Sequence, residues 1–187
     1  YFEGKVAVHR LKKSGAVAEG AVQTVTTEKN AHCILTDYGN RLALVPHTGP
    51  NAVYQFRFDP KTGKLSPSKP AKHVPKEKLS PRHVAFHPNK KYVYVVNEGS
   101  SSVTACRLQG DAIHPIHTLS TLPKGFAERN TCADVEVHPS GKFLYCSNRG
   151  HDSIAMFAID QETGRLTALG QASTEEMPRS FNVDPTG

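Results

Sequence analysis

Short apolar runs separated by turn-forming residues recur along the chain, and Ser80–Leu108 shows the pattern most clearly. Its β-branched and aromatic residues are concentrated in Tyr92–Val96 and Val103–Leu108, behind a shorter run that ends at Phe86. The breaks, His87–Lys90 and Glu98–Ser101, are rich in residues that favour turns. Because no helical period competes with this spacing, the pattern predicts three strands in an antiparallel meander.

The same pattern occurs more than once. His138–Arg149 repeats His87–Glu98 about 50 residues further on, and Asp37–Val45 falls on the same register one repeat upstream. Asp184–Gly187 opens what we expect to be a further copy. A period near 50 residues with four short strands per unit is typical of a β-propeller blade. The alternative is a β-sandwich whose hairpins are similar by coincidence.

The repeats divide the chain into blades of one all-β domain, a propeller of four-stranded antiparallel blades. We expect residues 5–11 and roughly 16–26 to be the third and fourth strands of a first, partial blade. The expected blades are approximately 1–27 (partial), 31–74, 82–121, 132–174 and 179–187 (partial). Closed propellers have four to eight blades, and an open arc leaves sheet edges exposed. We therefore expect a piece of a longer polypeptide with a partial ring; the alternative is that several copies complete one ring.

Composition and charge narrow the function classes. With 37% hydrophobic and 21% charged residues, the chain is expected to fold rather than to be disordered. It has no apolar run of 18 residues, so we expect no membrane partner. The formal net charge is +6, but the lysines are dispersed and have no interleaved aromatics. This distribution argues against a nucleic-acid partner, while a positive field would attract a small anionic substrate.

The spacing of the cysteines indicates in which cellular compartment the protein is expected. Cys33, Cys106, Cys132 and Cys146 form no CxxC pair, and three of them lie in predicted strands. We expect reduced core thiols rather than disulfides or a zinc site. The chain also lacks an Asn-x-Ser/Thr sequon, and both features favour a cytoplasmic location.

The predicted topology brings polar residues to one end of the ring. The turns between first and second strands, which contain His87 and His138, lie at the other end and are expected to be structural. The start of each first strand and the end of each second strand point towards the channel mouth. The residues at those positions are Ala31-His32, Arg82-His83, Ala133-Asp134, Arg179-Ser180, His47, Asn97-Glu98 and Asn148-Arg149.

These residue types could bind an anion and catalyse a reaction. Arginines suit bidentate binding of a phosphate or carboxylate and can stabilise an oxyanion. A carboxylate such as Glu98, or an imidazole such as His32 or His83, could act as a general base. The alternative is that Glu98 and Arg149 form a purely structural ion pair between blades. Spacings typical of a metal site, a phosphate-binding loop or a nucleophilic serine are absent, so no metal and no cofactor are expected.

At these residues the chain resembles the seven-bladed β-propeller lactonases, which include bacterial propeller-type 6-phosphogluconolactonases and the fungal 3-carboxy-cis,cis-muconate lactonizing enzyme. The resemblance runs from about Gly4 to Gly187. The motifs that carry it are His32 in NAHCILT, Pro81-Arg82-His83 with FHPN and KYVYVVNE, Ala133-Asp134 before FLYCSNRG, and Pro178-Arg179 with Phe181–Asp184.

The resemblance implies a site and a reaction. Matched motif by motif, the catalytic residues of the family fall on His32, Arg82, Glu98 and Arg149, and His83, Asp134 and Arg179 are secondary, substrate-binding candidates. The position of Glu98 is Thr48 in the preceding repeat and Arg149 in the next, so the repeats are chemically non-equivalent there.

The expected function is hydrolysis of a small anionic lactone, as by a 6-phosphogluconolactonase of the pentose phosphate pathway. In this reading Arg82 and Arg149 hold the phosphate or polarise the lactone carbonyl, and Glu98 or His32 activates water. Two alternatives stay open: a muconate-type cycloisomerase that uses the same residues, and a non-catalytic propeller that serves as an interaction scaffold. The oligomeric state is left open.

Overall fold

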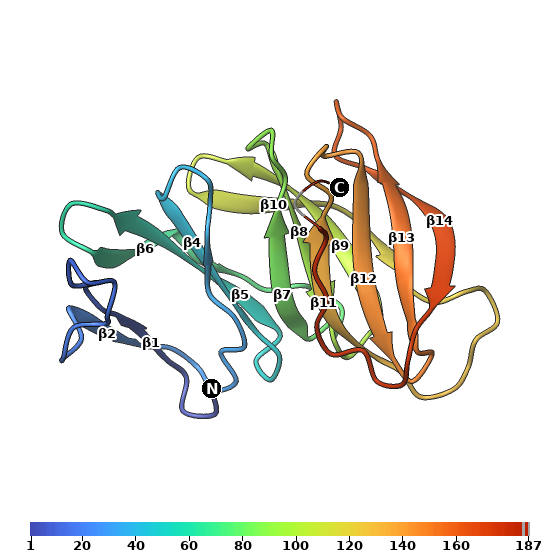
Figure 1. Cartoon of the computed structure of the whole chain (residues 1–187), viewed down its shortest axis with the longest axis horizontal. Coiled ribbons are helices and arrows are strands. Elements are labelled where there is room, and N and C mark those ends of the chain that lie inside the picture. Colours follow the sequence, from blue (N-terminus) through green and yellow to red (C-terminus); the bar gives the residue numbers. More distant parts are fainter. Residues whose placement is uncertain (185, 187) are drawn as a thin grey trace.

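The chain folds into β-strands and turns, and its sheets follow one another in chain order (Figure 1). The structure, a computed structural model, describes residues 1–184 and Thr186. No helix occurs in this described part, and three of its four sheets have four antiparallel strands. The prediction of an all-β chain with propeller-type blades is therefore confirmed.

The first sheet is a two-stranded hairpin, as expected from its two predicted strands, although both are shorter than the sequence pattern suggests. Its strands are β1 (Lys5–Val8) and β2 (Gln23–Thr26). The second sheet has the strands β3 (Leu35–Thr36), β4 (Leu42–His47), β5 (Ala52–Asp59) and β6 (Lys64–His73). We call this sheet blade two, because the hairpin β1–β2 precedes it.

The remaining two sheets repeat the same order of strands. Blade three consists of β7 (Pro81–Phe86), β8 (Tyr92–Asn97), β9 (Ser102–Gln109) and β10 (Ala112–Ser120). Blade four consists of β11 (Thr131–Val137), β12 (Phe143–Arg149), β13 (Ser153–Ile159) and β14 (Leu166–Ser173). Neighbouring strands in each sheet are consecutive in sequence, which is the meander that the turn spacing predicts.

Arg179 does not begin a strand, which corrects one expectation. Residues 174–184 form none in the described chain. A strand needs a hydrogen-bonded neighbour, and no described residue beyond Arg179 supplies a second strand. The expected turn at 184–187 includes Pro185 and Gly187, which lie outside the described residues. The fifth blade, and the treatment of the chain as one domain, stay predictions.

The turns at the end opposite the predicted site are structural, as expected for the repeated histidines. The backbone N–H of His87 donates to the carbonyl of Tyr92 at 2.9 Å, and that of His138 donates to Phe143 in the same way at 2.9 Å. In each turn the imidazole Nδ1 also accepts a backbone N–H two residues further on. His87 and His138 therefore stabilise equivalent turns.

Blades three and four share the largest core. Tyr92 and Tyr94 of β8 are fully buried and pack in one cluster with Leu144 of β12 and Phe157 of β13. Their hydroxyl groups donate across the interface to backbone carbonyls of the turn before β14, Tyr92 to Glu162 and Tyr94 to Gly164. Gly164 has a φ of +72°, and a Cβ there would overlap the Tyr92 ring, so this contact requires glycine.

Loss of side-chain volume in this core should destabilise the fold. Leu144 is 0% exposed, whereas Leu169 on β14 is 55% exposed. We expect Leu144→Ala to lower the free energy of unfolding by about 2–5 kcal/mol, because a buried leucine leaves a cavity. Leu169→Ala is the matched control and should change it by less than about 0.5 kcal/mol. Urea denaturation of both variants tests this, and equal losses would contradict the core assignment.

Candidate functional site

Six of the seven predicted site residues come together at one end of the blades. They form a chain of close contacts that we call the mouth cluster: His32, Arg82, His83, Glu98, Asp134 and Arg149. They come from the start of β7, the turn directly after β8, the first half of β11, the end of β12 and the segment before β3. The cluster forms because equivalent strands of neighbouring blades lie side by side, β7 next to β11 (Figure 1).

Matching bulges in β7 and β11 shape the cluster. Pro81 pairs with Asn97 and His83 with Val96, so Arg82 is the extra residue of β7. The same irregularity lies between Cys132 and Val135 in β11. A bulge bends the strand and redirects the side chains next to it. The two bulges therefore account for consecutive residues of one strand reaching the same site.

Glu98 lies between two arginines. Arg149 Nη2 donates to Glu98 Oε1 at 2.7 Å, and Arg82 Nε lies 3.7 Å from Glu98 Oε2. The Arg82 side chain is 2% exposed and that of Arg149 is 8% exposed, while Glu98 is 26% exposed. One carboxylate that water can reach thus faces two buried guanidinium groups.

Backbone carbonyls of β11 hold both arginines. Arg82 Nη1 donates to the carbonyl of Ala133 at 2.5 Å, and Arg149 Nη2 donates to that of Cys132 at 3.0 Å. The Nε–H groups of both arginines are buried and have no hydrogen-bond acceptor among the described residues. Burial lowers the pKa of Arg82, and the nearby charge of Arg149 acts in the same direction. Of the two carboxylates in the cluster, only Glu98 contacts the two guanidinium groups.

His83 and Asp134 form a second pair. His83 Nδ1 lies 2.7 Å from Asp134 Oδ1, which also accepts the backbone N–H of Val135 at 3.1 Å. Asp134 Oδ2 accepts the Ser180 hydroxyl at 2.9 Å. Burial raises the pKa of Asp134, but the hydrogen bonds from His83 and Ser180 outweigh it and leave that pKa below its usual value. Asp134 is thus a fixed carboxylate that favours the charged form.

His32 completes the cluster. Its ring centroid lies 5.0 Å from that of His83, and its Nδ1 is buried without a partner among the described residues. Burial, with smaller contributions from the charges of Arg82 and His83, lowers the pKa of His32 to about 4. The His32 imidazole is therefore neutral at physiological pH.

Two residues that the repeat places on the rim lie outside the mouth cluster. Arg179 is exposed and forms no ion pair with a described residue, although its charge contributes to lowering the pKa of Arg82. His47, which the repeat places at the mouth, is 0% exposed. Its Nδ1 lies 2.8 Å from the carbonyl of Val45 and its Nε2 2.9 Å from Thr27 Oγ1. Because both nitrogens are engaged inside the protein, His47 is a structural residue.

The sequence did not reveal three groups of the site. The carbonyls of Cys132 and Ala133 belong to the backbone and leave no trace in residue type. Ser180 was placed on the rim but not in the site, and its contact with Asp134 links the segment after β14 to β11. One signal in the sequence could have indicated this role. Ser180 directly follows Arg179, just as His83 directly follows Arg82 in an earlier repeat.

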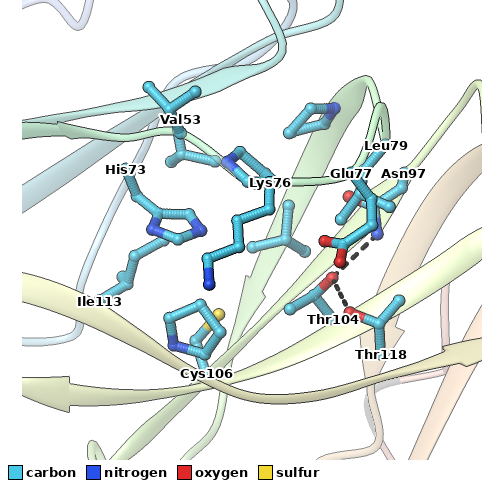
Figure 2. Close-up of a pocket in the computed structure, with 15 residues that line it drawn as sticks. Val53, His73, Lys76, Glu77, Leu79, Asn97, Thr104, Cys106, Ile113 and Thr118 are labelled. Atoms are coloured by element: carbon cyan, nitrogen blue, oxygen red, sulfur yellow. Dashed lines mark hydrogen bonds between the residues drawn. The ribbon is translucent and has the colours of Figure 1, made fainter.

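A separate cavity of about 310 Å³ lies between blades two and three. It is mainly apolar, and none of the predicted site residues lines it. Figure 2 shows that Asn97, Thr104 and Thr118 on its wall are joined by hydrogen bonds, so these polar groups are already satisfied. His73, Lys76 and Glu77 also line the cavity (Figure 2), but it lacks the buried arginine pair that the mouth cluster offers to an anion. The mouth cluster is therefore the better site for a polar ligand.

Two kinds of feature are absent from the described residues. No group of three or more His, Cys, Asp or Glu side chains is placed to hold a metal ion. Within the same part of the chain, no helix is long and apolar enough to cross a membrane.

Comparison with known proteins connects this geometry to a family. Residues 1–187 match the model of the family described as "Lactonase, 7-bladed beta-propeller". The chain is 34% identical over its whole length to a 6-phosphogluconolactonase of Erwinia tasmaniensis and covers 56% of that protein.

Solved structures agree with the fold. A protein from Lactobacillus plantarum matches with a TM-score of 0.89 at 27% identity, over 100% of this chain and 56% of the other. The periplasmic gluconolactonase of Pseudomonas aeruginosa matches with a TM-score of 0.89 at 24% identity, over 98% of this chain and 54% of the other. The chain thus spans about half the length of these proteins.

The titration of His32 tests the electrostatics of the cluster. We expect its imidazole to titrate with a pKa of about 4, measured by NMR, because burial and Arg82 oppose protonation. Arg82→Met removes one cause and should move the midpoint upwards, yet it should stay below the usual value of about 6.5 because burial remains. Arg57→Met, at an exposed arginine paired with Asp111, is the control and should leave the midpoint unchanged. A wild-type midpoint near 6.5 would contradict the described environment.

Proposed function

Because the chain belongs to the seven-bladed β-propeller lactonase family, we propose that the protein hydrolyses a phosphorylated sugar lactone, as the name of its relative 6-phosphogluconolactonase describes. The product would be the open-chain hydroxy acid, and the reaction would belong to the pentose phosphate pathway. The relatives' names support the reaction class, and the mouth cluster supports the kind of substrate.

One observation carries the proposal: two buried arginines converge on a single partly exposed carboxylate. Arg82 and Arg149 carry two positive charges, and Glu98 compensates one of them at this point. Arg179 adds a further positive charge nearby, while Asp134 is engaged with His83 and Ser180. Charge-assisted hydrogen bonds to a guanidinium are among the strongest in proteins. An anionic ligand therefore fits this mouth.

The same groups suit the chemistry of lactone opening. Attack of water on the lactone carbonyl places negative charge on its oxygen, and a buried guanidinium stabilises that charge best in a site from which water is excluded. Arg82 and Arg149 are held by backbone carbonyls, so their orientation is established before the substrate binds. Proton acceptors are also present, since Glu98, His32 and His83 all belong to the cluster. We propose that one of them activates the attacking water.

The free state of the cysteines is consistent with a reducing compartment. All four are free thiols within the described chain, and Cys106, Cys132 and Cys146 are buried. Free thiols persist where glutathione and thioredoxin keep them reduced. We propose a cytoplasmic location on this ground, and a redox-sensitive reporter fused to the intact protein in its source cell would test it.

Removal of Arg149 should reduce turnover strongly. In the intact protein we expect Arg149→Ala to lower kcat/KM for 6-phosphoglucono-δ-lactone by about 10²–10³-fold, since a positioned donor to the developing oxyanion is lost. Glu98→Gln should also lower it, because the amide no longer holds the two guanidinium groups. The measurement is the rate of acid release above the spontaneous rate.

The control is Arg57→Ala, at an exposed arginine of β5 near the opposite end of the blade. It should retain wild-type kcat/KM. An unphosphorylated lactone should react more slowly than the phosphorylated one if the arginines bind the phosphate. Folded Arg149→Ala and Glu98→Gln proteins with full activity would refute the site, and a wild-type protein without activity would favour the cycloisomerase or the scaffold.

A further inference from the structure

The mouth cluster offers three groups that could take the proton from water, and the structure distinguishes them. This inference rests on the proposed lactone hydrolysis and concerns which residue is its general base. A general base needs an unprotonated atom that is accessible to water, and a fixed orientation. Glu98, His32 and His83 differ in all of these respects.

Glu98 has little capacity left to accept a proton. Its Oε1 accepts a hydrogen bond from Arg149 at 2.7 Å, and its Oε2 faces Arg82 Nε at 3.7 Å. Protonation of this carboxylate would leave two buried guanidinium groups without their common counter-charge. Glu98 therefore serves to position the arginines.

His32 is oriented poorly for the role. Its Nδ1 is buried and has no partner among the described residues, so no acceptor fixes the tautomer or stabilises a protonated ring. With a pKa of about 4, lowered chiefly by burial, it would be a weak base at neutral pH. Its ring instead packs against those of Tyr1 and His83.

His83 has the missing features. An ionised Asp134 can only accept, so the His83 Nδ1 that lies 2.7 Å away is the protonated nitrogen, and Nε2 carries the free electron pair. The side chain is 26% exposed, so water can reach it. The nearest donor to Nε2 is Arg82 Nη1, at the long distance of 3.3 Å, and that nitrogen already donates to Ala133 at 2.5 Å.

Asp134 is itself held from three elements. Ser180 donates to Oδ2 from the segment after β14, and the backbone N–H of Val135 donates to Oδ1 within β11. The Asp134 N–H donates to Ser147 Oγ of β12 at 3.0 Å. A carboxylate fixed in this way orients an imidazole and stabilises its protonated form, as in other carboxylate–histidine pairs that act as bases.

We propose that His83 is the general base of the lactonase reaction and that Asp134, supported by Ser180, is its positioning residue. His83 Nε2 removes a proton from water as the water oxygen forms a bond to the lactone carbonyl carbon. The carbonyl electrons move to its oxygen, which the guanidinium groups of Arg82 and Arg149 stabilise. When the carbonyl re-forms, the bond from carbon to the ring oxygen breaks, and that oxygen takes the proton back from Nε2 as the product hydroxyl.

The charged groups around His83 are few. Arg82 is its neighbour on β7, His32 packs against its ring, and Asp134 and Glu136 act on it from β11. Burial and the charge of Asp134 raise the pKa of Glu136. One guanidinium group and one ionised carboxylate are thus the main charges that face the His83 ring.

The test is the pH dependence of kcat and KM for 6-phosphoglucono-δ-lactone in the intact protein. We expect His83→Gln to lower kcat by about 10²–10⁴-fold with KM changed only a few-fold, because base catalysis is lost and the arginines remain. Asp134→Asn should lower kcat and move the acidic limb of kcat/KM to lower pH, since the amide no longer favours the protonated imidazole. His138→Gln, in an exposed turn, is the control and should match the wild type.

A second measurement on the wild-type protein does not depend on how the variants fold. The ¹⁵N NMR signals of His83 should show a proton on Nδ1 and none on Nε2 at neutral pH. Imidazole rescue is a third measurement, made on a variant: added imidazole should restore part of the turnover of His83→Gly.

The outcomes separate the two proposals. Three outcomes would overturn the role of His83 and Asp134 but leave the lactonase function in place, provided that the wild-type protein hydrolyses the lactone. They are an unaffected His83→Gln variant, a proton on His83 Nε2, and an Asp134→Asn variant whose pH profile is unshifted. Absence of wild-type hydrolysis would overturn the lactonase function and with it the base.

Discussion

The packing of blade three against blade four determines where every part of the site lies. Tyr92 and Tyr94 are buried between the two sheets, and their hydroxyl groups reach carbonyls of the turn before β14. Burial of the two aromatic rings stabilises the interface between the sheets, and the two hydrogen bonds fix the position of one sheet relative to the other. Because Arg82 and Glu98 belong to one blade and Asp134 and Arg149 to the other, the site exists only at the angle that this packing sets.

The charges of the mouth cost stability that the rest of the fold has to supply. Buried ion pairs seldom repay the desolvation of both partners, and hydrophobic residues of similar size often stabilise more. Two nearly buried arginines share one carboxylate here, and their Nε–H groups have no acceptor within the described residues. A scaffold has no use for such an arrangement, whereas the proposed binding of an anion and stabilisation of an oxyanion would use it. A buried polar group without a partner is rare in folded proteins and calls for an explanation such as a catalytic role.

The repeat made much of the fold predictable, because the period of about 50 residues locates every turn and therefore every strand end. It also indicated that His32, Arg82, Glu98 and Arg149 would face one another, since equivalent strand ends meet in neighbouring blades. The pattern failed where a residue's environment departs from the repeat. His47 occupies a rim position but is buried against Val45 and Thr27, and Arg179 begins no strand in the described chain because it has no neighbour there.

Other features of the site could not be predicted from residue types at all. Bulges in β7 and β11 decide where Arg82 and Asp134 point, and they depend on backbone geometry. The acceptors of both arginines include peptide carbonyls, which every residue possesses. The pairing of His83 with Asp134 rather than with Glu98 also depends on distances that only the folded chain defines.

Three contacts of the site join residues 51 positions apart: Arg82 to Ala133, His83 to Asp134 and Glu98 to Arg149. Each contact therefore connects a position in one repeat with its own counterpart in the next. Repeats that arise by duplication begin with identical residues at such positions, and two like charges or two acceptors would then face each other. The side-chain contacts between His83 and Asp134 and between Glu98 and Arg149 therefore require the two repeats to differ at these positions, and a change at either residue removes the partner of a residue one repeat away.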